Sequence, residues 1–339
     1  MAEPPSDLVS LYPDLAPVAA ALRGMRRVIV VAHEKPDGDA VGSALALARA
    51  LRGLGKEVFL TGFEAMADIY YFLFKPGESC RATRDLLGKA DGLVAVDCAD
   101  QSRLAAFAGE DLSGLKTVNV DHHVTNDRFA EVNWVAGDVS STGEMVYFLT
   151  RHLGVPLTME LAEPLWTAIV TDTGNFCFSN TLPQTLRVAA ELLAAGVDCN
   201  RAYRKLRENK KLKDVFLMRR ALERLELCAE GRLGIITLRR EDFAEFSSGL
   251  YGLQDPVNLA LMVDSAVAAA FICEVPREDK IKVSLRAYEP YDVAKLARQF
   301  GGGGHARAAG FSFAGLTLAD AKGRTIAAME KMLRTTPGG

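Results

Sequence analysis

The sequence predicts an α/β protein: an N-terminal, mostly parallel sheet flanked by helices, then a linker helix and a smaller C-terminal domain with a mixed sheet. Two observations support this fold class. Along the first 195 residues, short runs rich in Val and Ile alternate with longer Ala- and Leu-rich segments, which is the order of βα units in a parallel sheet. The chain also has 339 residues, more than one hydrophobic core usually organises, so we expect a second domain.

The first βα unit lies between residues 28 and 51. Val28–Val31 is a β-branched run that predicts a buried strand, whereas Ala40–Leu51 is rich in Ala and Leu and predicts a helix. Pro36 and Gly38 predict a bend in the turn between them. The rest of this first domain, residues 1–195, repeats the alternation, with strands expected at 57–60, 92–97 and 116–121 and helices at 141–152, 159–171 and 184–195.

The composition changes after Gly196, where a segment rich in Lys and Arg begins. We interpret residues 196–224 as a linker helix with a solvated, charged face. Residues 225–339 are expected to form the second domain, with strands at 233–238, 266–275 and 281–285 and helices at 291–300 and 318–333.

The composition argues against several classes of protein and of partner. Hydrophobic residues make up 49% of the chain and charged residues 24%, which is typical of a globular protein. The formal net charge of −3 provides no basic field for long duplex nucleic acid, so a short or small substrate is favoured. The six cysteines show no CxxC spacing, which argues against a disulfide framework or a structural zinc site.

Neither a secretion signal nor a membrane span is expected. Residues 1–15 are acidic and lack a basic region followed by an apolar core. No apolar run reaches the length that crosses a bilayer. We therefore expect a cytoplasmic protein in a reducing compartment.

Side chains that bind metals gather where the expected strands end. The set comprises His33, Asp37 and Asp39 after the first strand, Asp97 after the third, Asp121, His122 and His123 after the fourth, and Asp172 at the end of a helix. In open α/β sheets, ligands bind at the carboxyl ends of the strands. Each residue alone has a structural explanation, for example Asp39 as a helix N-cap, but their joint occurrence favours one site.

Carboxylates and imidazoles without a thiolate suit a hard or borderline divalent ion such as Mn²⁺ or Mg²⁺ rather than a cysteine-bound zinc. The set is too large for one ion and sufficient for two. Two ions about 3.5–4 Å apart that share a carboxylate generate hydroxide at neutral pH and stabilise both oxygens of an in-line phosphoryl displacement. The sequence therefore predicts a two-metal centre that can support phosphoryl displacement.

Several motifs, in this order, resemble those of the DHH phosphoesterases, a family named for its Asp-His-His triplet. In the first half they are HEKPDGDAVGS at 33–43, VAVDCAD at 94–100, VNVDHHVTN at 118–126 and IVTDTGNF at 169–176. In the second half, VSLRA at 283–287 and GGGGHARAAGF at 301–311 resemble the DHHA1 domain that accompanies them. The resemblance covers nearly the whole chain. In length and in the pairing of its domains, the chain is most similar to the NrnA-like subfamily of nanoRNases and pAp phosphatases.

The resemblance implies a role for each residue of this set. One metal would be held by His33, Asp37 and Asp97, and the other by Asp39, Asp97, His122 and Asp172, with Asp97 as the bridge. Asp121 would orient a ligating histidine. His123 would contact the scissile phosphate or assist the leaving oxygen, so catalytic roles fall to Asp97, Asp121 and His123.

The glycine run Gly301–Gly304 has two interpretations. Consecutive glycines can form a flexible linker, but these lead into His305, and bare backbone N–H groups beside a histidine can bind an anion. Arg286 leaves an expected strand and could add a bidentate phosphate contact. The resemblance favours nucleotide binding by Arg286, Gly303, Gly304 and His305.

The resemblance implies a manganese-dependent hydrolase that acts on very short oligoribonucleotides as an exonuclease, on the 3′-phosphate of adenosine 3′,5′-bisphosphate (pAp), or on both. The alternatives are cleavage of cyclic dinucleotides or their linear products, hydrolysis of pyrophosphate, and a nucleotide sensor without turnover. The intact ligand set argues against the sensor. The GGGGH run at 301–305 together with Arg286 resembles a nucleotide-binding domain, which argues against a pyrophosphatase. We expect no membrane partner. The sequence does not decide between a monomer and a homodimer.

Overall fold

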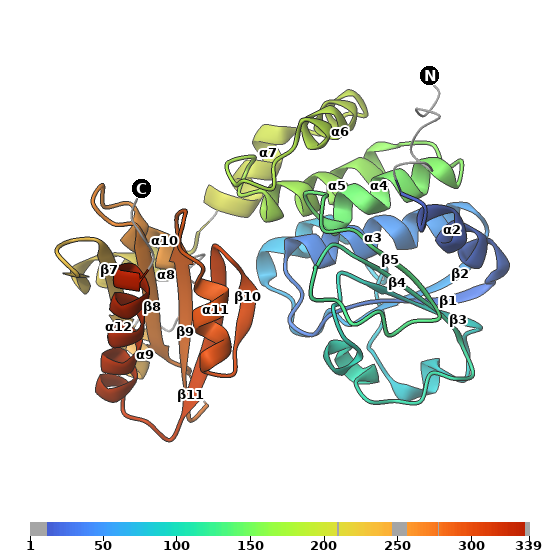
Figure 1. The fold of residues 1–339 in the computed structure, drawn as a ribbon. Coiled ribbons are helices and arrows are strands. Elements are labelled where there is room, and N and C mark those ends of the chain that lie inside the picture. The colour runs from blue at the N-terminus through green and yellow to red at the C-terminus, as the bar shows by residue number, and fades with distance from the viewer. Residues whose placement is uncertain (1–11, 209, 246–255, 277, 336–339) are drawn as a thin grey trace. The chain divides into compact units, whose positions relative to one another are not determined.

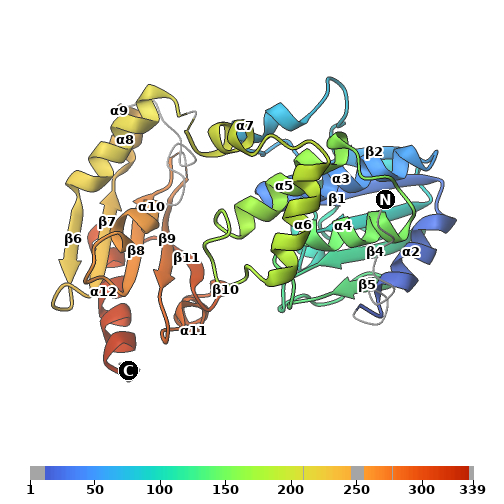
Figure 2. The same cartoon turned by 90° about the horizontal axis from the view of Figure 1, so that it is seen from above.

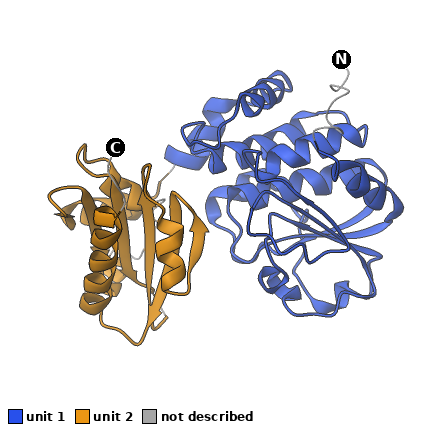
Figure 3. Cartoon of the chain, viewed as in Figure 1, with its two compact units in different colours: residues 1–208 blue, residues 209–339 orange. Residues whose placement is uncertain are grey.

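The computed structural model describes residues 12–208, 210–245, 256–276 and 278–335. The chain divides into two units, residues 1–208 and 209–339 (Figure 3). The range 196–224 contains α7 (Cys199–Tyr203) and a π-helical turn (Arg204–Glu208) in the first unit and α8 (Leu212–Glu223) in the second. Of residues 1–15, on which the expected lack of a secretion signal rests, 1–11 lie outside the described residues.

The sheet of the first unit has five parallel strands in the order β2-β1-β3-β4-β5. They are β1 (Arg27–Ala32), β2 (Glu57–Thr61), β3 (Gly92–Val96), β4 (Lys116–Asp121) and β5 (Val132–Val135). In β1, Val30 enters the core on one face of the sheet, and Ile29 and Val31 enter a core on the other. Burial on both faces explains why the strand is an unbroken apolar run rather than an alternating one.

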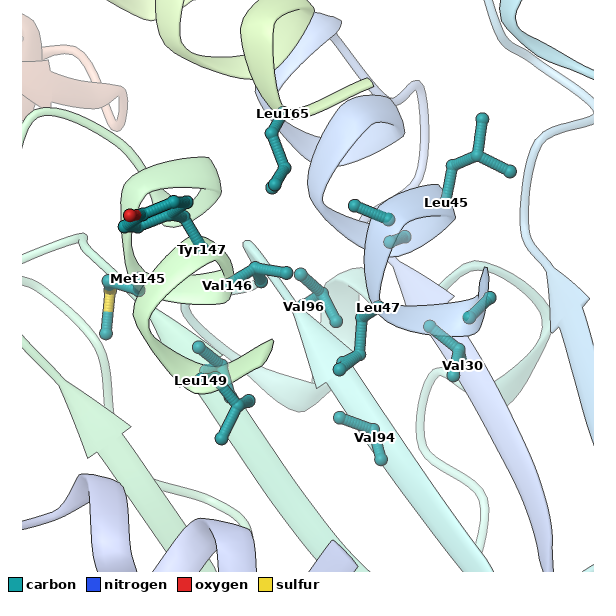
Figure 4. Close-up of a cluster of buried hydrophobic side chains, with 14 of the residues drawn as sticks. Val30, Leu45, Leu47, Val94, Val96, Met145, Val146, Tyr147, Leu149 and Leu165 are labelled. Atoms are coloured by element: carbon teal, nitrogen blue, oxygen red, sulfur yellow. The ribbon is translucent and has the colours of Figure 1, made fainter. Parts of the chain in front are cut away.

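Helices cover one face of this sheet (Figure 1). They are α2 (Leu15–Gly24), α3 (Gly38–Gly53), α4 (Thr142–His152), α5 (Met159–Asp172) and α6 (Pro183–Ala194). Helices α2, α3 and α4 contact the strands, α5 packs on α3 and α4, and α6 packs on α5. Leu47 of α3 and Leu149 of α4 share this core with Val94 of β3 (Figure 4).

The other face of the first sheet packs against 3₁₀ turns rather than α-helices. Leu86, Leu104 and Phe107 are buried there. The turns on this face are Arg84–Leu86, Gln101–Arg103 and Ala105–Phe107, and a further 3₁₀ turn, Asp68–Leu73, joins the helical face.

The sheet of the second unit has six strands in the order β10-β11-β9-β8-β7-β6, which Figure 2 shows across the sheet. It is mixed, because β7 and β8 are parallel whereas the other neighbours are antiparallel. The strands are β6 (Leu225–Cys228), β7 (Leu233–Leu238), β8 (Ala268–Glu274), β9 (Lys280–Ala287), β10 (Gly303–His305) and β11 (Ala308–Ala314).

Helices lie on both faces of this second sheet. Besides α8, the helices of this unit are α9 (Arg240–Glu245), α10 (Pro256–Leu261), α11 (Val293–Gln299) and α12 (Leu318–Thr335). Ile272 of β8 belongs to a core that includes α11 and α12, whereas the adjacent Phe271 belongs to a core that includes α8 and α10.

This arrangement confirms the predicted fold class, a parallel sheet flanked by helices followed by a mixed sheet. The sequence does not mark α2, α9, α10, β5, β6, β10 or β11. Most of these elements are short, and β10 consists largely of glycine, so neither length nor apolar periodicity identifies them. In the part of the chain that the structure describes, no helix combines the length and hydropathy needed to span a membrane.

Candidate metal centre

The register of the first sheet places three of the predicted site residues side by side. The last residues of β1 and β3 pair with each other, and the last residue of β3 pairs with Val120 of β4. The residues that follow these paired positions are His33, Asp97 and Asp121. Their side chains therefore originate at one edge of the sheet.

Two helices bring further carboxylates to this edge. Asp37 is the N-cap of α3, and its Oδ1 accepts hydrogen bonds from the N–H of Asp39 and of the next residue, both at 3.1 Å. Asp39 lies in the first turn of α3, and Asp172 is the last residue of α5. These helices approach closely because Gly42 has no side chain: a Cβ there would lie 2.2 Å from the carbonyl oxygen of Pro164.

The structure brings the six predicted metal ligands together in three overlapping groups. In each group, one donor atom from every residue lies within 4.8 Å of the others. The groups are His33, Asp37 and Asp97; Asp39, His122 and Asp172; and Asp97, His122 and His123. Asp97 and His122 are each common to two groups. Asp97 lies between the other two sets of donors, because it belongs to the group of His33 and Asp37 and its Oδ1 faces His122, a member of the group of Asp39 and Asp172.

The imidazole of His122 faces three carboxylates. Its Nε2 lies 3.7 Å from Oδ2 of Asp39 and 3.8 Å from both Oδ1 of Asp97 and Oδ2 of Asp172. These separations are too long for hydrogen bonds. Metal–ligand bonds of about 2.0–2.2 Å place neighbouring ligand atoms roughly 3–4 Å apart, so the donor set and its spacing fit a divalent cation.

A backbone hydrogen bond orients His33. Its Nδ1 lies 2.6 Å from the carbonyl oxygen of Glu34. Because a carbonyl oxygen only accepts hydrogen bonds, Nδ1 carries the proton and Nε2 is left as the ligating nitrogen. Nε2 lies 3.9 Å from Oδ2 of Asp97, so the two oxygens of Asp97 face two different histidines.

A buried carboxylate holds His123. Its Nδ1 lies 2.7 Å from Oδ1 of Asp121, and Asn126 donates to Oδ2 of Asp121 at 2.6 Å. Burial alone would lower the pKa of His123, but the hydrogen bond to Asp121 and the charge of Asp97 raise it to about 9. Burial alone would raise the pKa of Asp121, but the hydrogen bond and charge of His123 bring it below its ordinary value. The two side chains therefore form an ion pair between a buried carboxylate and a partly buried imidazole.

Three other carboxylates are destabilised as anions. Burial, followed by repulsion from neighbouring carboxylates, raises the pKa of Asp39 well above its ordinary value and also raises the pKa of Asp97. The same causes raise the pKa of Asp172 to about 8. A cluster of like charges of this kind is costly without a cation, which supports a metal centre.

Several contacts to these carboxylates involve residues that were not predicted from the sequence. Ser43 Oγ donates to Oδ1 of Asp39 at 2.9 Å, and the backbone N–H groups of Thr142 and Gly143 donate to its two oxygens at 2.8 Å. The Ser-Thr-Gly-Glu helix start at Ser141 is the sequence signal for these backbone donors. Further unpredicted neighbours are Arg103, Asn126 and Asn180, which contact His33, Asp121 and Asp172.

The predicted substrate-binding residues lie in the second unit. Arg286 is on β9 and His305 is on β10, and both pair with Ala308 of β11. Residues directly opposite on neighbouring strands point to the same face of a sheet. The half-buried Arg286 and the exposed His305 therefore share one face.

The glycine run before His305 is ordered structure rather than a linker. Gly303 and Gly304 belong to β10, and Gly301 follows α11 with a φ of 74°, the left-handed conformation of a helix C-cap. A Cβ at Gly302 or Gly304 would lie 2.1 or 2.5 Å from a carbonyl oxygen of β11. The turn and the strand packing require these glycines whether or not the run binds a ligand.

Two protein families match this chain. The N-terminal domain of the DHH family matches residues 27–169, and the DHHA1 domain matches residues 257–335. The first range contains all the predicted metal ligands except Asp172. The second contains Arg286 and the glycine run with His305.

Relatives and a solved structure extend the similarity to almost the whole chain. The bifunctional oligoribonuclease and PAP phosphatase NrnA of Thermus thermophilus is 37% identical over 319 residues, which is 93% of each chain. The protein of the same name from Bacillus subtilis is 29% identical over 311 residues, 91% of this chain and 95% of that protein. An exopolyphosphatase-related protein from Bacteroides fragilis shares the fold, with a TM-score of 0.86, 24% identity and coverage of 95% and 98%.

Proposed function

This chain belongs to the DHH family, and from that premise we propose that it is a two-metal phosphoesterase acting on very short oligoribonucleotides and on the 3′-phosphate of pAp. The observation that carries the proposal is the cluster of carboxylates and imidazoles in which Asp97 and His122 link three overlapping groups of three donors. The relatives that match nearly the whole chain are named for both activities.

Six residues fit two divalent ions. We assign His33, Asp37 and Asp97 to one ion, and Asp39, His122 and Asp172 to the other. Asp97 is assigned to the second ion as well, because its Oδ1 faces Nε2 of His122 at 3.8 Å. All donors are carboxylate oxygens or imidazole nitrogens, so Mn²⁺ is preferred, with Mg²⁺ as the alternative. When bound, such ions lower the pKa of water and neutralise phosphate oxygens.

Asp121 and His123 are the groups that we assign to proton transfer. Asp121 accepts a hydrogen bond from the Nδ1–H of His123, which leaves Nε2 as the nitrogen that can reach a substrate. The charge of Asp121 keeps the imidazole protonated. His123 can then give its Nε2 proton to the leaving oxygen as the bond between that oxygen and phosphorus breaks.

The second unit contains the groups that we assign to the rest of the nucleotide. A guanidinium such as that of Arg286 binds a phosphate through two parallel hydrogen bonds, and His305 lies on the same face of the sheet. The formal net charge of −3 gives little non-specific attraction for long RNA. Both features favour recognition of a short, individually bound nucleotide.

A turnover assay with five substrates tests the proposed function. The full chain with Mn²⁺ receives pAp, a labelled RNA dinucleotide, a long single-stranded RNA, a cyclic dinucleotide or pyrophosphate. We expect hydrolysis of pAp and of the dinucleotide, and much slower hydrolysis of the long RNA. If only the cyclic dinucleotide or only pyrophosphate is hydrolysed, the proposed substrates are wrong and that compound takes their place. If the chain binds nucleotides but hydrolyses none of the five substrates, it is a sensor rather than an enzyme.

Substitution of Asp97 tests the bridging role. Asp97→Asn keeps the size of the side chain and removes its charge. Because bound metals contribute several kcal/mol to the transition state, we expect kcat to fall by at least about 10³-fold with unchanged circular dichroism. The matched control is Asp85→Asn, an exposed aspartate of the same unit, which should keep wild-type kcat. Wild-type turnover by Asp97→Asn would contradict the assignment.

A further inference from the structure

Thr142 contacts carboxylates from both proposed metal positions. Its backbone N–H donates to Oδ2 of Asp39 at 2.8 Å, and its side-chain Oγ1 donates to Oδ1 of Asp97 at 2.9 Å. Both hydrogen bonds join residues far apart in the sequence, and Thr142 is fully buried.

The hydroxyl of Thr142 is not used to cap its own helix. Ser141 is the N-cap of α4, and its Oγ accepts the N–H of Glu144 at 3.2 Å. Thr142 is the first residue of the helix, where its backbone N–H has no partner within the helix. Its Oγ1 donates to a carboxylate that the helix does not contain, so a role in the local helix does not account for it.

The hydrogen bond from Thr142 fixes the orientation of the proposed bridging carboxylate. Oδ1 of Asp97 accepts the hydroxyl and also faces His122 at 3.8 Å, while Oδ2 faces His33 at 3.9 Å. If this carboxylate rotated, Oδ1 would no longer face His122 and Oδ2 would no longer face His33. The hydrogen bond from Thr142 to Oδ1 opposes that rotation, as hydrogen bonds to a metal ligand commonly fix the orientation of the ligand.

We propose that Thr142 is a positioning residue that sets the relation between the two metal positions, through its N–H on Asp39 and its hydroxyl on Asp97. This inference rests on the proposed two-metal function. The first turn of α4 then does more than begin the helix. Thr142 links Asp39, the proposed ligand of one ion, to Asp97, the carboxylate proposed to be shared by both ions. The side chain acts through Asp97 and contacts no substrate in this proposal.

Two substitutions separate the hydroxyl from the backbone donor. Thr142→Val removes the hydroxyl and keeps the β-branched shape and the N–H, whereas Thr142→Ser keeps both donors. Thr150→Val is the matched control, because Thr150 is also buried on α4 but donates its hydroxyl to the carbonyl oxygen of Tyr147. Thr142→Ala repeats the removal of the hydroxyl with a smaller side chain should the valine variant fail to fold.

Calorimetric titration of the metal-free full chain with Mn²⁺ and the electron paramagnetic resonance spectrum of the loaded chain test the inference. We expect two ions with a spin-coupled spectrum for the wild type, Thr142→Ser and Thr150→Val. For Thr142→Val we expect one ion to bind about 10- to 100-fold more weakly, with loss of the coupled signal.

The outcomes distinguish this inference from the proposed function. Two ions with wild-type affinity and a wild-type coupled spectrum in Thr142→Val, or in Thr142→Ala if that variant is used, overturn the inference alone. A wild-type chain that binds only one Mn²⁺ overturns the two-metal function and the inference with it. An equal loss in Thr150→Val and Thr142→Val assigns the effect to helix stability and also overturns the inference.

Discussion

At the scale of single residues, Asp97 combines a left-handed backbone conformation with a strand hydrogen bond and a carboxylate in the candidate metal centre. Its backbone is left-handed, with a φ of 56°, a conformation that aspartate adopts more readily than most side chains. Its N–H still donates to the carbonyl oxygen of Val120 at 2.9 Å, so the strand ladder continues to this residue. The carboxylate therefore leaves a rigid strand end, and the histidines that face its two oxygens are set by the fold.

The titration of the buried acids predicts how the metal-free chain responds to pH. The pKa of Asp172 is raised by burial to about 8 in the folded chain, compared with about 4 in the unfolded chain. Between these values the folded state holds a proton that the unfolded state has released, so stability falls as the pH rises. His123, whose pKa is raised to about 9, adds a loss of the same sign as the pH rises from about 6.5 to 9.

We therefore expect the unfolding temperature of the metal-free chain to fall from pH 5 to pH 8, measured by differential scanning calorimetry after chelation. Asp172→Asn should flatten the part of this fall below pH 8, since its amide does not titrate. Saturating Mn²⁺ should raise the unfolding temperature most at high pH, because the ion binds the deprotonated carboxylates. A wild-type unfolding temperature that rises over this range would contradict the charge assignment.

At the scale of elements, the site depends on how closely α3 and α5 approach. Gly38 and Gly42 of α3 face α5, and a Cβ on Gly38 would lie 2.3 Å from the side-chain oxygen of Thr171. Asp37 is the N-cap of α3, Asp39 lies in its first turn, and α5 ends with Asp172, so the separation of the helices also sets the separation of these carboxylates.

Substitution of a helix-contact glycine tests this dependence. Gly42→Ala places a Cβ against the backbone of α5, so we expect it to destabilise the chain by about 1–3 kcal/mol and to weaken Mn²⁺ binding. Gly53→Ala in the same helix has no atom within 4 Å of the added Cβ, and it should change stability by less than about 1 kcal/mol. Denaturant unfolding and calorimetric titration measure the two effects, and equal stability of both variants would be evidence against the contact.

At the scale of the whole molecule, the proposed function divides between the two units. The candidate metal ligands all belong to residues 1–208, and the candidate phosphate-binding residues all belong to residues 209–339. Substitution of a phosphate-binding residue in the second unit should therefore weaken substrate binding and leave metal binding unchanged. Substitution of a metal ligand in the first unit should weaken metal binding and leave the phosphate-binding residues of the second unit intact.

Arg286→Ala tests this division. A hydrogen bond to a charged group contributes about 1.5–3 kcal/mol, so we expect KM for pAp to rise about 10- to 100-fold. The affinity for Mn²⁺ should stay at the wild-type value. Arg298→Ala, which removes an exposed arginine of α11, is the control and should leave KM unchanged. An altered Mn²⁺ affinity with an unchanged KM would contradict the division.

Much of this protein can be predicted from its sequence because the decisive signals are local. Most of the strands and helices are marked by apolar β-branched runs, by Ala- and Leu-rich segments and by the helix start at Ser141. These signals predict the fold class that the structure confirms. The polar residues His33, Asp97 and Asp121 follow the ends of such runs, so their common edge follows from parallel strands. The roles of these residues as ligands stay a prediction until metal binding is measured.

Only the tertiary structure decides what surrounds those residues. The hydrogen bonds from Thr142 and Gly143 to Asp39 span 103 and 104 residues. The helix start at Ser141 marks the donors, but no short-range pattern identifies Asp39 as their acceptor. These hydrogen bonds depend on the strand order β2-β1-β3-β4-β5 and on the glycine contacts between helices. The sequence by itself determined which groups end each strand, because chain direction and helix starts are set by neighbouring residues. The packing of complete elements decided which distant groups hold those carboxylates in place, because a contact of that kind exists only once the layers have assembled.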